Sequence, residues 1–143
     1  MKRDAVPAEL RRLVIERAAN RCEYRGLSQL GQEATFHVDH VTPIAFEGET
    51  NLDNLALACV SCSLRKAARE KGFDPETGEE VRLFNPRRDD WSAYFRWDGI
   101  HLVGLSSIGR ATIHALKMNR PLVLAIREEE VALGRHAGAN PSV

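Results

Sequence analysis

Apolar residues in the first half of the chain recur at the spacings typical of helices and strands. An apolar side chain every three to four residues predicts a helix over residues 7–20. Residues 34–44 alternate apolar and polar side chains and are rich in β-branched types, which predicts a strand. Residues 55–59 are apolar and short, as in a second strand, and residues 60–72 are good helix formers that end at a glycine.

The second half of the chain predicts a hairpin and two further helices. Asp98 and Gly99 stand between two apolar runs, a strong hairpin signal. Helices are expected over residues 106–119 and, after a proline at position 121, over residues 121–133. The order of elements predicts the α+β class.

The length and the composition are those of an ordinary globular protein. A chain of 143 residues has the size of one domain and can bury roughly 68–70% of its unfolded surface, so it need not depend on a metal staple. We divide it into a core over residues 1–73 and an extension over residues 74–143 that packs on this core within one compact domain. No apolar run approaches the roughly 20 residues that cross a membrane.

Charge by itself says little about the partner. Twenty Lys and Arg residues balance twenty Asp and Glu residues, so the net charge is zero. The basic residues do form two clusters, which are phosphate-contacting patches or ordinary solvated helix faces. Their members are Arg11, Arg12, Arg17, Arg21 and Arg25 in the first, and Arg65, Lys66, Arg69 and Lys71 in the second. Three cysteines with a Cys-x-x-Cys spacing indicate metal or redox chemistry in a reducing, cytoplasmic setting.

The residues suited to chemistry gather between positions 36 and 66. Asp39 and His40 are adjacent on a predicted strand, where neighbouring side chains point to opposite faces, so a catalytic pair needs a twist or bulge to converge. Either residue alone is weak evidence, but further elements follow in a fixed order. These are Pro43, the run Asn51-Leu52-Asp53-Asn54-Leu55, the Cys-x-x-Cys pair Cys59 and Cys62, and Lys66.

This order of motifs resembles the HNH endonuclease family, which is built on the ββα-metal finger. The C-terminal region is also similar to an extension found on some bacterial members. The resemblance implies an α+β fold in which a ββα-metal finger follows an N-terminal helix and precedes a C-terminal extension of a hairpin and helices. It further implies a metal-dependent endonuclease that hydrolyses phosphodiester bonds in DNA.

Individual roles follow from the same resemblance. His40 matches the general base, and Asn54 matches the middle residue of the signature, which helps to position the histidine. Asp39 matches a ligand of one divalent cation, Mg²⁺ or Mn²⁺. Ser63 stands where members of the family commonly have Asn or His as the second metal ligand, so reduced activity is expected. As an alternative, Asn54 serves only as a turn residue. His37, on the same strand face as Asp39, is a solvated strand histidine or else approaches the metal or the substrate.

The resemblance also implies a structural zinc site that this chain has partly lost. Four-cysteine members clamp the finger with two Cys-x-x-Cys pairs, whereas this chain has Cys22, Cys59 and Cys62, with Arg25 at the fourth position. Arginine has no lone pair to offer a metal. We therefore expect no tightly bound structural zinc and cysteines packed as small buried hydrophobes. A three-thiolate site completed by water or by His37 is the alternative.

Two functions of different classes remain open at this stage. The first is a DNA endonuclease in which Arg25, Arg65 and Lys66 contact the nucleic acid, although a solvated basic face explains these residues equally well. The second is a catalytically impaired relative that binds nucleic acid or a protein partner without cutting. His40 and Asp39 favour the first function, and Ser63 together with Arg25 favours the second. The oligomeric state is open.

Overall fold

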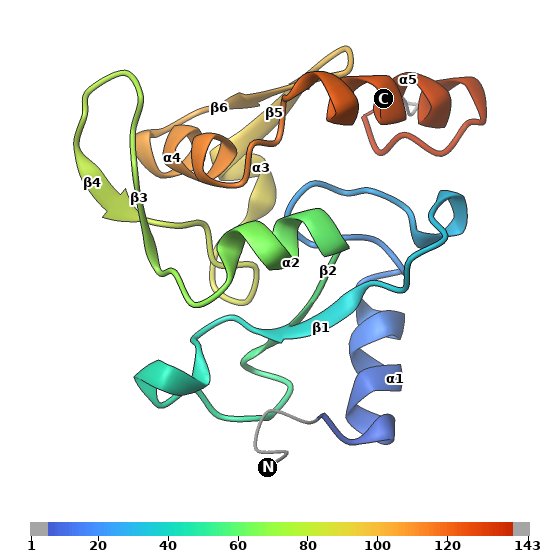
Figure 1. The fold of residues 1–143 in the computed structure, drawn as a ribbon, viewed down its shortest axis with the longest axis vertical. Helices are drawn as coiled ribbons and strands as arrows, with labels where there is room; N and C mark the ends of the chain where they lie inside the picture. Colours follow the sequence, from blue (N-terminus) through green and yellow to red (C-terminus); the bar gives the residue numbers. More distant parts are fainter. Residues whose placement is uncertain (1–5, 139–143) are drawn as a thin grey trace.

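The computed structural model describes residues 6–138 and combines helices with three two-stranded antiparallel sheets, which confirms the α+β class (Figure 1). The sheets pair β1 with β2, β3 with β4, and β5 with β6. Two short 3₁₀ turns lie at Gln29–Gly31 and Ile44–Phe46. The helices and strands are α1 (Ala8–Arg17), β1 (His37–His40), β2 (Leu55–Ala58), α2 (Val60–Lys66), β3 (Lys71–Phe73), β4 (Glu80–Arg82), α3 (Trp91–Tyr94), β5 (Phe95–Asp98), β6 (His101–Gly104), α4 (Ser107–Ala115) and α5 (Pro121–Ala132).

The predicted strand, strand and helix of the finger form one continuous unit. In the β1–β2 pair His40 lies opposite Leu55, and every residue of β2 is buried. Helix α2 follows β2 directly, and the Sγ atom of Cys59 caps its first turn by accepting a hydrogen bond from the backbone N–H of Cys62. Helix α1 packs against β2, and its Arg17 donates to the carbonyl oxygen of Leu55 at 2.7 Å. The buried strand β2 thus packs against both α1 and α2.

Two local predictions were wrong in their boundaries. Helix α2 ends at Lys66 because Ala67 adopts φ 47° and ψ −128°, so the helix stops well before Gly72. Gly72 instead lies in β3, where an added Cβ would come within 3.0 Å of Leu83. Pairing with β4 therefore overrides the helix propensity of this segment. In the last hairpin Asp98 still pairs with His101, so the turn residues are Gly99 and Ile100 rather than Asp98 and Gly99. The single-turn helix α3 was not predicted.

The hydrophobic core is shared by the two segments of the chain. Edge-to-face contacts join Tyr24 to Phe84, with ring centroids 6.4 Å apart, and Phe84 to Phe95, with centroids 5.1 Å apart. The indole N–H of Trp91 donates to the carbonyl oxygen of Tyr24 at 2.9 Å. One buried cluster accordingly contains residues of the finger and of the extension: Val14, Cys22, Tyr24, Leu27, Phe36, Val38, Leu55, Leu57, Ala58, Cys59, Cys62, Phe84, Phe95, Leu102, Leu116 and Met118.

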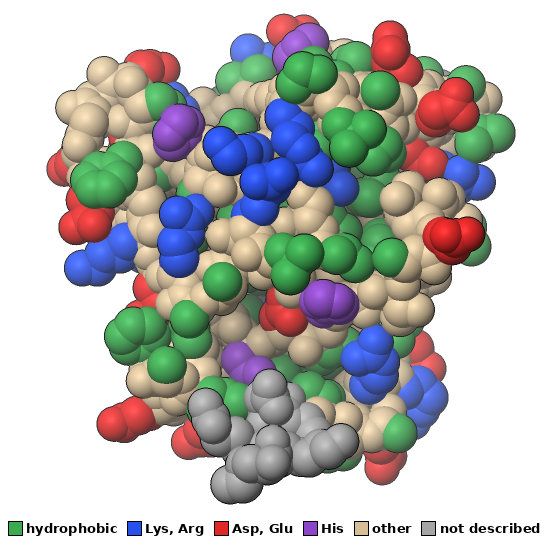
Figure 2. All heavy atoms as spheres, in the orientation of Figure 1, with side chains coloured by type: hydrophobic (Ala, Val, Ile, Leu, Met, Phe, Trp, Pro, Cys, Tyr) green, Lys and Arg blue, Asp and Glu red, His purple; other side chains and the backbone are tan. Residues whose placement is uncertain are grey.

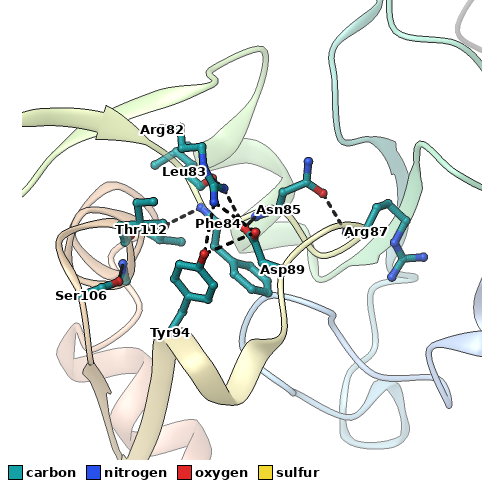
Figure 3. A network of polar contacts seen from close by, with 11 residues as sticks. Arg82, Leu83, Phe84, Asn85, Arg87, Asp89, Tyr94, Ser106 and Thr112 are labelled. Carbon is teal, nitrogen blue, oxygen red and sulfur yellow. Dashed lines mark hydrogen bonds and ion pairs between the residues drawn. The ribbon is translucent and has the colours of Figure 1, made fainter.

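A polar network shapes the turn that follows β4 (Figure 3). The guanidinium of Arg82 donates to both carboxylate oxygens of Asp89, at 2.7 and 3.1 Å. Asp89 also accepts from the backbone N–H of Asn85 at 2.9 Å. The backbone N–H of Phe84 donates to the hydroxyl of Thr112 in α4 at 2.9 Å. These contacts fix the turn on α4 and direct the next residues toward the finger.

Arg87 leaves this turn and connects it to β2. Its guanidinium forms an ion pair with Glu23 and donates to the carbonyl oxygen of Leu55 at 3.2 Å. Glu23 in turn accepts from the backbone N–H of Leu57 at 2.9 Å. The side chains of Arg87 and Glu23 are only 13% and 12% exposed, so this pair links the extension to the central strand of the finger in a mostly buried position.

None of the helices in residues 6–138 combines the length and the apolar character needed to span a membrane.

Candidate active site

Asp39, His40 and Ser63 line one open pocket of about 300 Å³ beside α2. Strand alternation predicts that the side chains of Asp39 and His40 face apart, and both residues line this pocket. The reason is that β1 ends at His40, and the turn that follows, beginning at Pro43, supplies part of the wall. The other residues that line the pocket are Pro43, Ile44, Ala45, Ala67 and Ala68.

The imidazole of His40 is oriented by Thr50. The Nε2 atom of His40 lies 2.8 Å from the Thr50 hydroxyl, and which of the two donates depends on the tautomer of the ring. When Nε2–H donates to Thr50, the Nδ1 atom carries the lone pair that a general base needs. Sequence reasoning missed Thr50 because it lies in a polar loop with no motif of its own.

Asn54 lies outside the pocket and braces the loop between the two strands. Its Oδ1 atom accepts from the backbone N–H of Thr42 at 2.8 Å, and its amide donates to the carbonyl oxygens of Thr42 at 3.0 Å and Glu49 at 2.8 Å. The loop is tight, since a Cβ at Gly48 would come within 1.7 Å of the Thr42 carbonyl oxygen. Asn54 therefore holds the loop that carries Thr50, one residue after Glu49.

Ser63, which the sequence suggested as the second metal ligand, contacts His37. The Ser63 hydroxyl lies 2.7 Å from Nδ1 of His37, which ties the first turn of α2 to β1. The carboxylate of Asp39 and the hydroxyl of Ser63 are hard oxygen donors in one open pocket, so they suit Mg²⁺ or Mn²⁺ with water as the remaining ligands. His37 is connected to these two oxygen donors by its hydrogen bond with Ser63.

The three basic residues that the sequence suggested for DNA contact differ in their exposure to solvent. Lys66 is 4% exposed, and its ammonium donates to the carbonyl oxygen of Val41 at 3.0 Å. Burial lowers the pKa of Lys66, and the nearby Asp39 carboxylate opposes this effect. Arg25 is 6% exposed and points into the protein. Arg65 alone is partly exposed, so it is the member of the three that can reach a ligand outside the protein.

A basic patch lies on the same face as the pocket. Figure 2 shows Lys and Arg side chains gathered between α2 and the start of α5, above histidines that lie near β1. Arg120, which precedes α5, donates to the hydroxyl of Ser61 in α2 at 3.1 Å. Burial, together with the charges of Arg65 and Arg25, lowers the pKa of Arg120. Within the described part of the chain neither Arg65 nor Arg120 forms an ion pair with a carboxylate.

The three cysteines, Cys22, Cys59 and Cys62, meet in a buried cluster. Their Sγ atoms all lie within 4.8 Å of one another, and none forms a disulfide. Hydrogen bonds from the Cys22 and Cys62 thiols, aided by the charge of Arg25, lower the pKa of Cys59. The pKa of Cys22 is raised, chiefly by burial, and that of Cys62 by its hydrogen bonds to the other two sulfurs. The cysteines are buried as expected, but they form a polar cluster rather than an apolar filling.

Comparison with known proteins agrees with this geometry. Residues 20–69 match the family model of the HNH endonuclease, and this range contains the cysteine cluster, the pocket and the β1–β2–α2 unit. The chain therefore carries an HNH endonuclease domain, as its motifs predicted. Comparison with curated proteins and with solved structures gave no match.

Proposed function

We propose that this protein is a cytoplasmic, metal-dependent endonuclease that hydrolyses phosphodiester bonds in DNA. The observation that carries the proposal is the shared pocket of Asp39, His40 and Ser63 within the HNH segment. A nuclease of this type needs a base for water and hard ligands for a cation at the same phosphate. The pocket is open to the surface on the face that also carries the basic patch, so a long polyanion has access to both.

In the proposed reaction the residues of the pocket divide the work. Nε2–H of His40 donates to Thr50, which leaves Nδ1 to take the proton of the attacking water. Asp39 and Ser63 would hold Mg²⁺ or Mn²⁺, which supplies positive charge against the charge that develops on the phosphate. His37 keeps the Ser63 hydroxyl in place through their 2.7 Å contact. Asn54 holds the loop that carries Thr50 close to the end of β1.

The second candidate is an impaired relative that binds nucleic acid, or a protein partner, without cutting it. What favours this candidate is the hydroxyl of Ser63 as a metal ligand. Its hydroxyl is a weaker neutral donor than an Asn amide oxygen, and it already makes a hydrogen bond with His37. A cation bound by Asp39 alone among charged side chains would be held weakly.

Nicking of supercoiled plasmid DNA distinguishes the two candidates. The nuclease is expected to convert the plasmid to the open circular form with Mg²⁺ or Mn²⁺, and EDTA is expected to stop the reaction. Absence of cleavage with either cation, together with salt-sensitive DNA binding, would select the impaired relative. Cleavage that continues in EDTA would contradict the metal-dependent proposal.

The hydrogen bond from Thr50 provides a finer test of the base. Thr50→Val keeps the shape of the side chain but removes its hydroxyl, so the imidazole loses its orienting partner, and we expect the nicking rate to fall about 10–100-fold. Thr50→Ser restores a hydroxyl and should recover most of the rate. Thr35→Val, at an exposed position outside the pocket, is the matched control. A Thr50→Val protein as active as Thr35→Val would show that His40 needs no such partner.

We assign the contact with the DNA backbone to Arg65 and Arg120, because Arg25 and Lys66 are buried. Each Arg→Gln substitution at positions 65 and 120 should weaken binding to any duplex sequence similarly. It should also reduce the slope of log affinity against log salt by about 0.9 for each phosphate contact removed. Arg12→Gln removes an exposed arginine of α1 that already pairs with Glu16 and serves as the control. Equal salt slopes for all these proteins, measured by fluorescence anisotropy, would refute the assignment.

A further inference from the structure

The cysteine cluster already contains a cation, the guanidinium of Arg25. The Nε–H of Arg25 donates to the Sγ atom of Cys59 at 3.1 Å, and the arginine is only 6% exposed. The three sulfurs around it lie within 4.8 Å of one another. A buried guanidinium is unfavourable unless it is paired, and a sulfur that accepts its hydrogen bond is such a partner.

The turn between Cys22 and Leu27, which carries Arg25, is closed by two backbone hydrogen bonds. The backbone N–H of Gly26 donates to the carbonyl oxygen of Cys22 at 2.8 Å, and the N–H of Cys22 donates to the carbonyl oxygen of Leu27 at 2.9 Å. Gly26 has φ +75°, which suits glycine at the end of such a turn. The residue three positions after Cys22 therefore faces the other two cysteines, and in this chain that residue is an arginine.

The residues present do not fit the structural zinc that the HNH resemblance implies. Structural zinc takes four ligands in a tetrahedron, with Zn–S bonds of about 2.3 Å. Cys22, Cys59 and Cys62 supply three, and within residues 6–138 no His, Asp or Glu atom joins them. His37, the alternative fourth ligand, instead binds Ser63. A Zn²⁺ ion bonded to Cys59 would also lie next to the guanidinium of Arg25, and the two positive charges repel each other in a buried position.

Further positive charge lies close to the same cluster. The charge of Arg25 acts on both Arg120 and Arg127, and the two arginines are themselves partly or wholly buried. Arg25 forms no ion pair with a carboxylate in the described part of the chain. A divalent metal in the cluster would add to this positive charge.

We propose that the side chain of Arg25 has replaced the structural zinc ion of the HNH finger, so that the hydrogen bond from its guanidinium to the Sγ atom of Cys59 clamps the finger without metal. Cys22 and Cys62 complete the cluster, because their Sγ atoms lie within 4.8 Å of that of Cys59. The substitution Arg25→Cys should then reverse the exchange and create a four-cysteine zinc site. This proposal concerns the clamp and is independent of nuclease activity.

Metal content and thermal stability test the proposal together. Purified wild-type protein is expected to contain almost no zinc by mass spectrometric elemental analysis, and its Tm should not change with EDTA. Arg25→Cys is expected to bind about one zinc per chain and to lose Tm when EDTA is added. Arg12→Cys, which adds a fourth thiol on the exposed face of α1, is the matched control and should bind none tightly.

A third substitution tests the clamp itself. Arg25→Met keeps a long side chain but removes the charge and the Nε–H donor, so its Tm should fall below that of the wild type while its zinc content stays near zero. One zinc tightly held by each wild-type chain would overturn the proposal. So would an Arg25→Met protein as stable as the wild type, or a folded Arg25→Cys protein that takes up no more zinc than Arg12→Cys. The wild-type and Arg25→Met measurements decide the matter even where Arg25→Cys fails to fold.

Discussion

Replacing His40 with alanine is expected to slow plasmid nicking by about 10²–10⁴-fold, the usual contribution of a general base. The substitution removes the imidazole of His40, which lines the pocket together with Asp39 and Ser63. It leaves the proposed ligands Asp39 and Ser63 unchanged, so binding of the cation and of DNA should persist while cleavage is lost. The measurement is the initial rate of open-circle formation in Mg²⁺, with DNA affinity determined separately.

The control for this prediction is His101→Ala. His101 is an exposed histidine of β6 that lies outside the pocket, so its removal tests for a general effect of losing a histidine. We expect wild-type nicking from this variant. Cleavage that survives His40→Ala would indicate a contaminating nuclease or a different base, and either result would remove the assignment of His40.

Replacing Arg87 with alanine is expected to have the largest effect on stability. The substitution leaves the carboxylate of Glu23 without its ion-pair partner in a position where both side chains are mostly buried, and it removes a hydrogen bond to the Leu55 carbonyl oxygen. Breaking a buried pair in this way typically costs about 3–5 kcal/mol. Because Arg87 joins the extension to β2, urea should unfold the variant in one transition with a much lower midpoint.

The exposed ion pairs of α1 provide the comparison. Arg12 pairs with Glu16 at 3.0 Å, with both side chains more than half exposed, so Arg12→Ala should cost less than about 1 kcal/mol. An Arg87→Ala protein as stable as Arg12→Ala would show that the ion pair contributes little to the joint core. Two separate unfolding transitions in the wild type would contradict our proposal that residues 1–73 and 74–143 form one domain.

Local sequence patterns were sufficient for most of the elements around the site. The helical spacing before residue 20 became α1, the alternation around Val38 became β1, and the apolar run at Leu55 became the buried β2. Each of these patterns reflects burial of one face of one element, which a short window of sequence records directly. The hairpin after Phe95 and helix α5 follow from equally local turn and proline signals.

Local patterns failed where a distant partner determined the conformation. The residues after Lys66 favour a helix, but they pair with β4 and pack on α4, and these contacts outweigh a propensity difference of less than about 1 kcal/mol per residue. Asp39 and His40 both line the pocket, although strand alternation predicts that their side chains face apart. The alternation rule holds within a strand, whereas β1 ends at His40 and the next turn closes the pocket.

For the function, the chain's own motifs identified the HNH segment and the residue types at each of its positions, because motif order and spacing are properties of the sequence. They also revealed that Arg25 stands where a fourth cysteine is expected. The contacts that give these residues their roles were not predictable: Thr50 on His40, His37 on Ser63, and Arg25 on Cys59. Each joins residues 10 to 34 positions apart, and their approach depends on how loops and the shared core fold in three dimensions rather than on any local pattern.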